Sequence, residues 1–238
     1  MAEEAPQVKP RSSCLGKLVV LIALLGVVGL GAAVYFIATP QDLSDIKGRT
    51  AGLASASTPP NLATILEKSI EGVYPISISE EQLNRYVQAT LEAKQGGPLS
   101  GMVDLEGVRI RLHEGFAEVI IERTIFGRPQ TLSMYVKVEQ FIDIQGKTKG
   151  NAILGGEQYF PDTPRLDRFI RGGRFGKLEV PQGFLVLVTP SFKKLAAVYR
   201  EELRLGFEEM SRITFEKGKL ILDPRADGGS LDPGSGVF

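Results

Sequence analysis

Residues 107–138 read GVRIRLHEGFAEVIIERTIFGRPQTLSMYVKV, and this stretch decides the fold class. Apolar and polar residues alternate along it, which is the pattern of β-strands that bury one face. The Gly-containing breaks at residues 113–115 and 127–129 predict two turns, so we expect a long antiparallel meander. Its first strand is expected to begin earlier, at Val103. The alternation changes phase at Gln140-Phe141, which predicts a β-bulge in the last strand.

A helix is expected directly before the meander. Ser79 has the character of an N-cap, and Gln82 stands in the capping-box position three residues later. An apolar stripe follows at helical spacing, and Gly96-Gly97-Pro98 ends it. Asn84 lies within this helix. We interpret Asn84 as a hydrogen-bonding partner of adjacent backbone, with contact to a ligand at the mouth of a groove as the alternative.

The residues after the meander predict a strand at 151–160 and an irregular segment at 161–177. A second long helix is expected from Pro190 to Met210, because apolar residues recur at helical spacing over about five turns. Apolar runs on both sides of Lys217-Gly218 predict a closing β-hairpin.

An uninterrupted apolar run without any charged residue, Leu18–Ala38, lies near the N-terminus. At about 1.5 Å per residue, a helix over this run crosses a hydrocarbon core of roughly 30 Å. Basic residues are slightly more frequent before the run than just after it, so the positive-inside rule predicts a cytoplasmic N-terminus. The run is longer than the apolar region of a signal peptide, so we expect a single-pass signal anchor, with a cleaved signal as the alternative. Gly29 and Ala33 form a small-x-x-x-small pair that would allow a weak homodimer.

These signals predict five parts along the chain. They are a cytoplasmic N-terminus (1–17), a transmembrane helix (18–38), a flexible tether rich in small residues and Pro (39–60), an extracytoplasmic domain (61–224) and a disordered tail (225–238). Asn61 is expected to cap a short helix that ends at Gly72. We expect this helix to pack on the domain, with packing on the bilayer as the alternative.

Composition argues against several functional classes. Lys and Arg together number 28, as do Asp and Glu, so the chain offers no general attractive field for a nucleic acid. The only cysteine, Cys14, precedes the apolar run, which leaves none for a zinc site beyond it. The only histidine, His113, is expected in an exposed turn, and no G-x-S-x-G motif supplies a nucleophile. We therefore expect a binding protein rather than an enzyme, with no catalytic residue, no metal site and no cofactor.

Five cations recur at a strict spacing of three in PRLDRFIRGGRFGK, residues 164–177. They are Arg165, Arg168, Arg171, Arg174 and Lys177. Apolar side chains are interleaved with them, so guanidinium groups could pair with lipid phosphates while the apolar groups touch acyl chains. The alternative is a solvated loop whose arginines pair with the acids of the domain itself.

Four segments carry a family resemblance by their order along the chain. They are ISISEEQLNRYV, VRIRLHEGFAEVII, GKLEVP and ITFEKGKLILDP. Over residues 75–224 the chain resembles YpmS-like and LmeA-like bacterial extracytoplasmic proteins, in which a helix with a Leu-Asn pair, here Leu83-Asn84, precedes a curved antiparallel sheet. The resemblance implies an α+β fold related to tubular lipid-binding domains. In such a fold, a curved antiparallel β-sheet wraps one or two long helices and leaves an apolar groove.

The leading functional expectation is binding of a lipid, or of another hydrophobic or anionic envelope ligand, outside the bacterial cytoplasmic (inner) membrane. Acyl chains would lie between the sheet and the apolar face of the second helix, and the cationic segment would guide anionic headgroups. The residues of that face are Phe192, Tyr199, Phe207 and Met210. Ordinary core packing is the alternative for each of them. A tethered scaffold that holds a partner in an envelope protein complex is the alternative function.

Overall fold

A computed structural model describes residues 14–48, 61–95, 107–125, 127–142 and 148–225. Several expectations lie outside the described residues: most of the cytoplasmic N-terminus, tether residues 49–60, the break at Gly96-Gly97-Pro98, the strand start at Val103 and nearly all of the tail. The described part contains one apolar N-terminal helix followed by helices and antiparallel sheets. The predicted α+β class is therefore confirmed.

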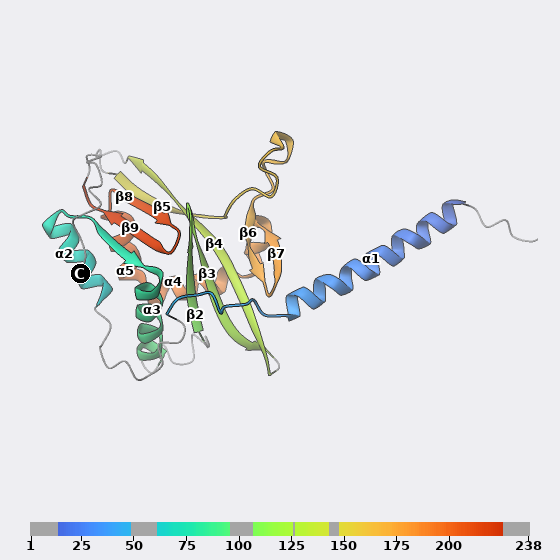
Figure 1. Cartoon of the computed structure of the whole chain (residues 1–238), viewed down its shortest axis with the longest axis horizontal. Helices are drawn as coiled ribbons and strands as arrows, with labels where there is room; N and C mark the ends of the chain where they lie inside the picture. The colour runs from blue at the N-terminus through green and yellow to red at the C-terminus, as the bar shows by residue number, and fades with distance from the viewer. Residues whose placement is uncertain (1–13, 49–60, 96–106, 126, 143–147, 226–238) are drawn as a thin grey trace, which may run out of the picture.

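The N-terminal helix, α1 (Cys14–Ala38), extends away from the rest of the chain (Figure 1). Residues Leu15–Ala38 are long and apolar enough to cross a membrane, and none of their most apolar stretch is buried inside the protein. This confirms an N-terminal helix that can span a bilayer. Gly29 and Ala33 lie on this helix, and their contact with a second copy stays a prediction.

In the described part of the chain, nine strands form two antiparallel sheets. The larger sheet contains β2 (Gly107–His113), β3 (Phe116–Ile125), β4 (Arg128–Ile142), β5 (Thr148–Leu154), β6 (Arg171–Phe175) and β7 (Leu178–Pro181). The smaller sheet has the spatial order β1 (Ile76–Ser79), β9 (Lys219–Asp223) and β8 (Arg212–Glu216). The strands thus divide into two sheets, and the single curved sheet that the resemblance implies is not confirmed.

The meander of β2, β3 and β4 is confirmed, with His113 opposite Phe116 across the first turn. The bulge predicted at Gln140-Phe141 is wrong, because the pairing of β4 with β5 runs through it without a register shift. Phe141 is half exposed at this end of β4, so burial does not dictate the phase of the alternation there. A register shift is found instead in β6, between Arg171 and Gly173.

Two further expectations about strands need correction. The strand predicted at 151–160 is β5, which lies earlier and leaves the sheet after Leu154, where Gly155 adopts a φ of +136°. The segment expected to be irregular, 161–177, contains β6, which pairs with β4. Gly172 and Gly173 weaken the sequence signal for a strand, but in the structure they let neighbouring backbone approach closely.

The remaining helices are α2 (Leu62–Gly72), α3 (Glu80–Gln95), α4 (Thr189–Val198), α5 (Arg200–Glu208) and the 3-10 helices η1 (Pro164–Leu166) and η2 (Gln182–Leu187). The predicted capping box is confirmed: the Gln82 amide donates to the Ser79 hydroxyl, and the Ser79 amide donates to the Gln82 side chain. Asn61 caps α2, which contacts α5. The short helix therefore packs on the domain, as predicted.

The second long helix is not continuous, which corrects the sequence prediction. It is broken at Tyr199, whose φ and ψ of −107° and 29° separate α4 from α5. The Tyr199 hydroxyl donates to the Val87 carbonyl oxygen at 2.7 Å, so the side chain is fixed inside the core against α3. The break coincides with this tertiary contact, and an apolar pattern at helical spacing does not reveal such a break.

Helices cover one face of the larger sheet. Val108, Ile121 and Met134 belong to a buried cluster with side chains of α3 and α4. A second cluster joins α2, α5 and the smaller sheet, and it contains Leu66 and Leu222. Asn84 of α3 is fully buried and exchanges two hydrogen bonds with the backbone of Ile110, which confirms its structural interpretation.

The opposite face of the larger sheet is covered by residues 39–48, which we call the strap. Leu43 and Ile46 are 4% exposed and form a small cluster with Ile120 of β3. Figure 1 shows the strap running from the end of α1 across the sheet toward α3. The first part of the expected flexible tether is therefore packed on the domain, because its two apolar side chains find a partner in β3.

Candidate functional site

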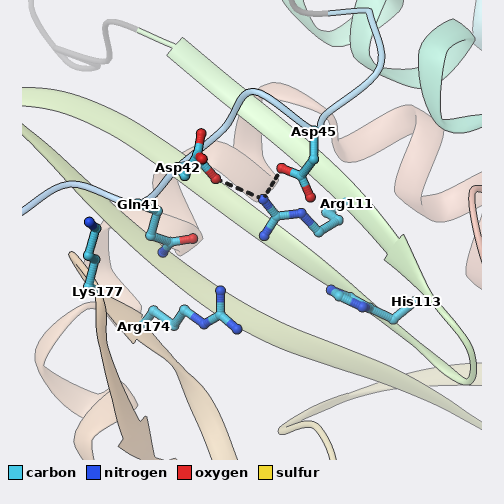
Figure 2. A pocket seen from close by; sticks show the side chains of 7 residues that line it. All are labelled: Gln41, Asp42, Asp45, Arg111, His113, Arg174 and Lys177. Carbon is cyan, nitrogen blue, oxygen red and sulfur yellow. Dashed lines mark hydrogen bonds and ion pairs between the residues drawn. The ribbon is translucent and has the colours of Figure 1, made fainter.

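An open pocket of about 450 Å³ lies between the strap and the polar face of the larger sheet. Its lining comes from four segments: the strap, β2, β6 and the turn between β6 and β7. The lining residues are Gln41, Asp42, Asp45, Arg111, His113, Arg174 and Lys177 (Figure 2). Six of the seven can carry a charge, so the pocket is suited to a polar or charged ligand.

The strap is fixed beside the pocket by polar contacts with β4. The backbone N–H of Gln41 donates to the Thr131 hydroxyl at 2.9 Å, and the side-chain nitrogen of Gln41 donates to the Ser133 hydroxyl at 3.2 Å. Alternation along β4 directs Thr131 and Ser133 to this face and Leu132 and Met134 to the core. The alternation along β4 thus provides both the apolar side chains of the core and the polar side chains that hold the strap.

A fully buried carboxylate, Glu118 of β3, lies next to the pocket. It accepts hydrogen bonds from the Arg111 guanidinium at 2.7 Å and from the Ser133 hydroxyl at 2.6 Å. The His113 Nε2 atom lies 3.6 Å from it. Burial alone would raise the pKa of Glu118, but the hydrogen bonds and the charges of Arg174 and Arg111 outweigh it and lower the pKa. The carboxylate therefore stays charged beneath the pocket.

Arg111 joins this buried charge to the strap. Its guanidinium donates to the Asp45 carboxylate at 2.8 Å and to the Asp42 carbonyl oxygen at 3.1 Å, in addition to Glu118 (Figure 2). Burial opposes the charge of Arg111, but the carboxylates of Glu118 and Asp45 outweigh this effect and raise its pKa. The Arg111 guanidinium is thus already engaged by acceptors of the protein.

His113 is placed differently from its prediction. It ends β2, its side chain is 35% exposed, and its ring stacks on Phe116 with centroids 4.5 Å apart. The ring points into the pocket opposite Arg174 (Figure 2). His113 is therefore half buried in the site instead of lying in an exposed turn.

The five regularly spaced cations do not form one surface. Arg174 and Lys177 line the pocket, and the Arg174 guanidinium extends toward its centre (Figure 2). Arg171 lies 3.8 Å from Glu179 and over the ring of Tyr159. Arg165 and Arg168 are exposed in the segment before β6. A strand cannot keep residues spaced by three on one face, since its side chains alternate.

The four apolar residues expected to face a ligand are placed mainly in the cores. Phe192 and Tyr199 belong to the cluster under the larger sheet, and Met210 is fully buried in the second cluster. Phe207 is partly buried and lies beside Gly150 of β5. Phe192, Tyr199 and Met210 thus pack in the cores, which is the alternative to contact with a ligand.

The pocket lies at the C-terminal end of α1. The backbone N–H of Lys177 donates to the carbonyl oxygens of Phe36 and Thr39, both at 2.9 Å. The Gln130 side chain donates to the carbonyl oxygen of Ala38. Two of the last carbonyls of α1 are thus capped by the domain: that of Phe36 by the turn between β6 and β7, and that of Ala38 by Gln130 of β4. This turn also supplies Lys177 to the pocket.

The sequence interpretation missed most of this site, including Glu118 and Arg111. One signal was present: a turn at residues 114–115 places Arg111 directly opposite Glu118 on the paired strand, as the register shows. No comparable local signal places the strap residues there, since their partners are distant in sequence. Among the described residues, no group of three or more His, Cys, Asp or Glu side chains is arranged to hold a metal ion. No protein-family model, curated protein or solved structure matches the chain significantly.

Proposed function

We propose that this chain is a membrane-anchored binding protein whose pocket holds the anionic headgroup of a lipid or of a lipid-like ligand. The observation that carries the proposal is the double role of the turn between β6 and β7. Its Lys177 lines the pocket, while its backbone caps the end of α1. A helix that spans a bilayer ends near the headgroups, so the pocket would open at the membrane surface.

The chemistry of the pocket supports an anion with several acceptor oxygens. Arg111 is engaged by Glu118 and Asp45, so Arg174 and Lys177 are the other two cations of the pocket lining, and the Arg174 guanidinium extends toward the pocket centre (Figure 2). A guanidinium and an ammonium group together suit a phosphate, the first through paired hydrogen bonds and the second as a point charge. His113 adds a ring nitrogen on the opposite side.

The acyl chains of the bound lipid would lie in the bilayer. Phe192, Tyr199 and Met210 are buried in packed cores, so these three side chains of the Pro190–Met210 segment are not available to acyl chains. A headgroup bound at the end of α1 needs no apolar groove, because its acyl chains can remain among the membrane lipids. As part of the same proposal, the N-terminus is cytoplasmic and the domain lies outside a bacterial inner membrane.

The test uses the full chain in nanodiscs that contain equal amounts of phosphatidylglycerol and phosphatidylcholine. Native mass spectrometry of the ejected protein should show retained phosphatidylglycerol in preference to phosphatidylcholine. R174Q and K177Q should each lower this retention about tenfold, since a hydrogen bond to a charged group contributes about 1.5–3 kcal/mol. R204Q is the matched control, because Arg204 is an exposed arginine of α5 away from the pocket. Equal retention in all four proteins would refute headgroup binding in this pocket.

A tethered scaffold is the second candidate, and the packed cores favour it. The apolar residues expected to bind a ligand are instead used to stabilise the domain. A scaffold would retain no lipid in preference to another and would be recovered with an envelope protein after crosslinking in cells. The lipid measurement therefore separates the two functions.

A further inference from the structure

Residues 155–170 form an ordered projection between β5 and β6, which we call the prong. Backbone hydrogen bonds close its base: the Gly156 N–H donates to the Arg171 carbonyl oxygen, and the Arg171 N–H donates to that of Glu157. The Tyr159 N–H donates to the Phe169 carbonyl oxygen at 2.8 Å, which joins the two arms higher up. The prong therefore has a defined shape and presents its tip in a fixed direction.

The tip of the prong exposes aromatic side chains next to arginines. Phe160 and Phe169 are 48% and 49% exposed, and Arg165 and Arg168 between them are exposed as well. Half-exposed phenyl rings at the end of a projection gain little from their own domain. Aromatic rings beside basic groups are typical of segments that lie at a membrane interface.

The prong leaves the sheet on the same side as α1 (Figure 1). β6 connects the two features, since its first residue closes the base of the prong and the turn after it caps α1. The helix η2 starts beside the base, where the Gln182 N–H donates to the Ile170 carbonyl oxygen at 2.9 Å. Phe184, Val186 and Leu187 of this helix are also exposed.

We infer that the prong is a second membrane contact, whose Phe160 and Phe169 rings enter the boundary between headgroups and acyl chains of the bilayer that α1 spans. The occupant is this bilayer because the prong projects from the side of the sheet from which α1 also departs, and both are fixed to β6 (Figure 1). Arg165 and Arg168 would pair with lipid phosphates around the inserted rings. The inference rests on the membrane anchoring of the proposed function and is independent of what the pocket binds.

The chain contains no tryptophan, so single-tryptophan variants report one position each. F160W and F169W test the tip, and F141W is the matched control. Phe141 is 49% exposed and lies at the end of β4 that pairs with the start of β5. That end of β4 lies away from α1 (Figure 1). The full-length variants are reconstituted in phosphatidylcholine vesicles with brominated acyl chains. F160W and F169W should be quenched about threefold more than F141W, because interfacial residues lie about 5–10 Å into the boundary.

Quenching of both tip variants at the level of F141W, with emission of a water-exposed indole, would overturn the inference. Circular dichroism of each variant confirms that the fold is retained, and the two tip positions check one another. The result is separable from the proposed function. Insertion of the tip in phosphatidylcholine vesicles, together with unchanged lipid retention in R174Q, would support the membrane contact of the prong and reject headgroup binding in the pocket. No insertion of the tip, together with reduced lipid retention in R174Q, would reject the membrane contact and support headgroup binding.

Discussion

Replacing Glu118 by glutamine should destabilise the domain more than any surface charge substitution. Glu118 is fully buried and accepts hydrogen bonds from Arg111 at 2.7 Å and from Ser133 at 2.6 Å. A glutamine keeps the volume and one acceptor oxygen, but it places an NH₂ group against one of these donors and leaves Arg111 without its buried counter-charge. Removing one partner of a buried pair costs about 3–5 kcal/mol. We expect about 3 kcal/mol, because Arg111 keeps its bond to Asp45.

The assay is urea unfolding of the full chain in detergent micelles, followed by far-ultraviolet circular dichroism. E81Q is the matched control, since Glu81 pairs with Arg85 and both side chains are about half exposed. An exposed pair of this kind contributes about 0.5 kcal/mol or less. A loss in E118Q no larger than that in E81Q would refute the view that Glu118 anchors this face of the sheet. The double variant R111M/E118Q should lose less than the sum of the single variants, because it removes both charges together.

Three further predictions concern the same face and its supports. The pKa of Glu118 is lowered in the folded chain. The stabilising contribution of this carboxylate is therefore complete above the ordinary carboxyl pKa of about 4.3, and it disappears as the pH falls through the pKa of Glu118 in the folded chain. Unfolding free energies measured from neutral to acid pH should show this dependence in wild type and a weaker one in E118Q. N84A should lower the unfolding free energy by roughly 2 kcal/mol in the same urea assay, because it leaves backbone groups of β2 buried without partners; an unchanged midpoint would contradict this. G176A should detach the strap from the sheet, since a Cβ there would lie 2.4 Å from the Thr39 carbonyl oxygen at the start of the strap, at a φ of +55°. Faster limited proteolysis within residues 39–48 is expected. G183A, whose Cβ meets no atom within 4 Å, should match wild type.

The candidate site shows where inference from sequence ends. Alternation along β2 and β3 directs Arg111 and Glu118 to the polar face, and the turn between the strands sets them opposite each other. That pair follows from local pattern alone. Gln41 and Asp45 reach the same pocket across more than sixty residues of chain. Their neighbourhood is rich in small and polar residues, a composition that predicts a flexible tether.

The cationic segment shows the same limit from the other direction. A spacing of three suggests one surface, but the structure places Arg174 in a strand, Lys177 in a turn and Arg168 in the prong. The side chains of these residues then point in different directions, because side chains alternate between the two faces of a strand, whereas those of the prong are directed by its own backbone hydrogen bonds. Regular spacing in a sequence therefore has no spatial meaning until the element that carries it is known.

Sequence by itself determined the features that depend on neighbours along the chain. The length of the apolar run, the Ser79–Gln82 capping box and the meander all follow from local periodicity and capping chemistry. Only the tertiary structure decided the break at Tyr199, the division into two sheets and the burial of the strap. These depend on contacts between segments far apart in sequence, where a single partner, such as Val87 for Tyr199 or Ile120 for the strap, overrides the local preference.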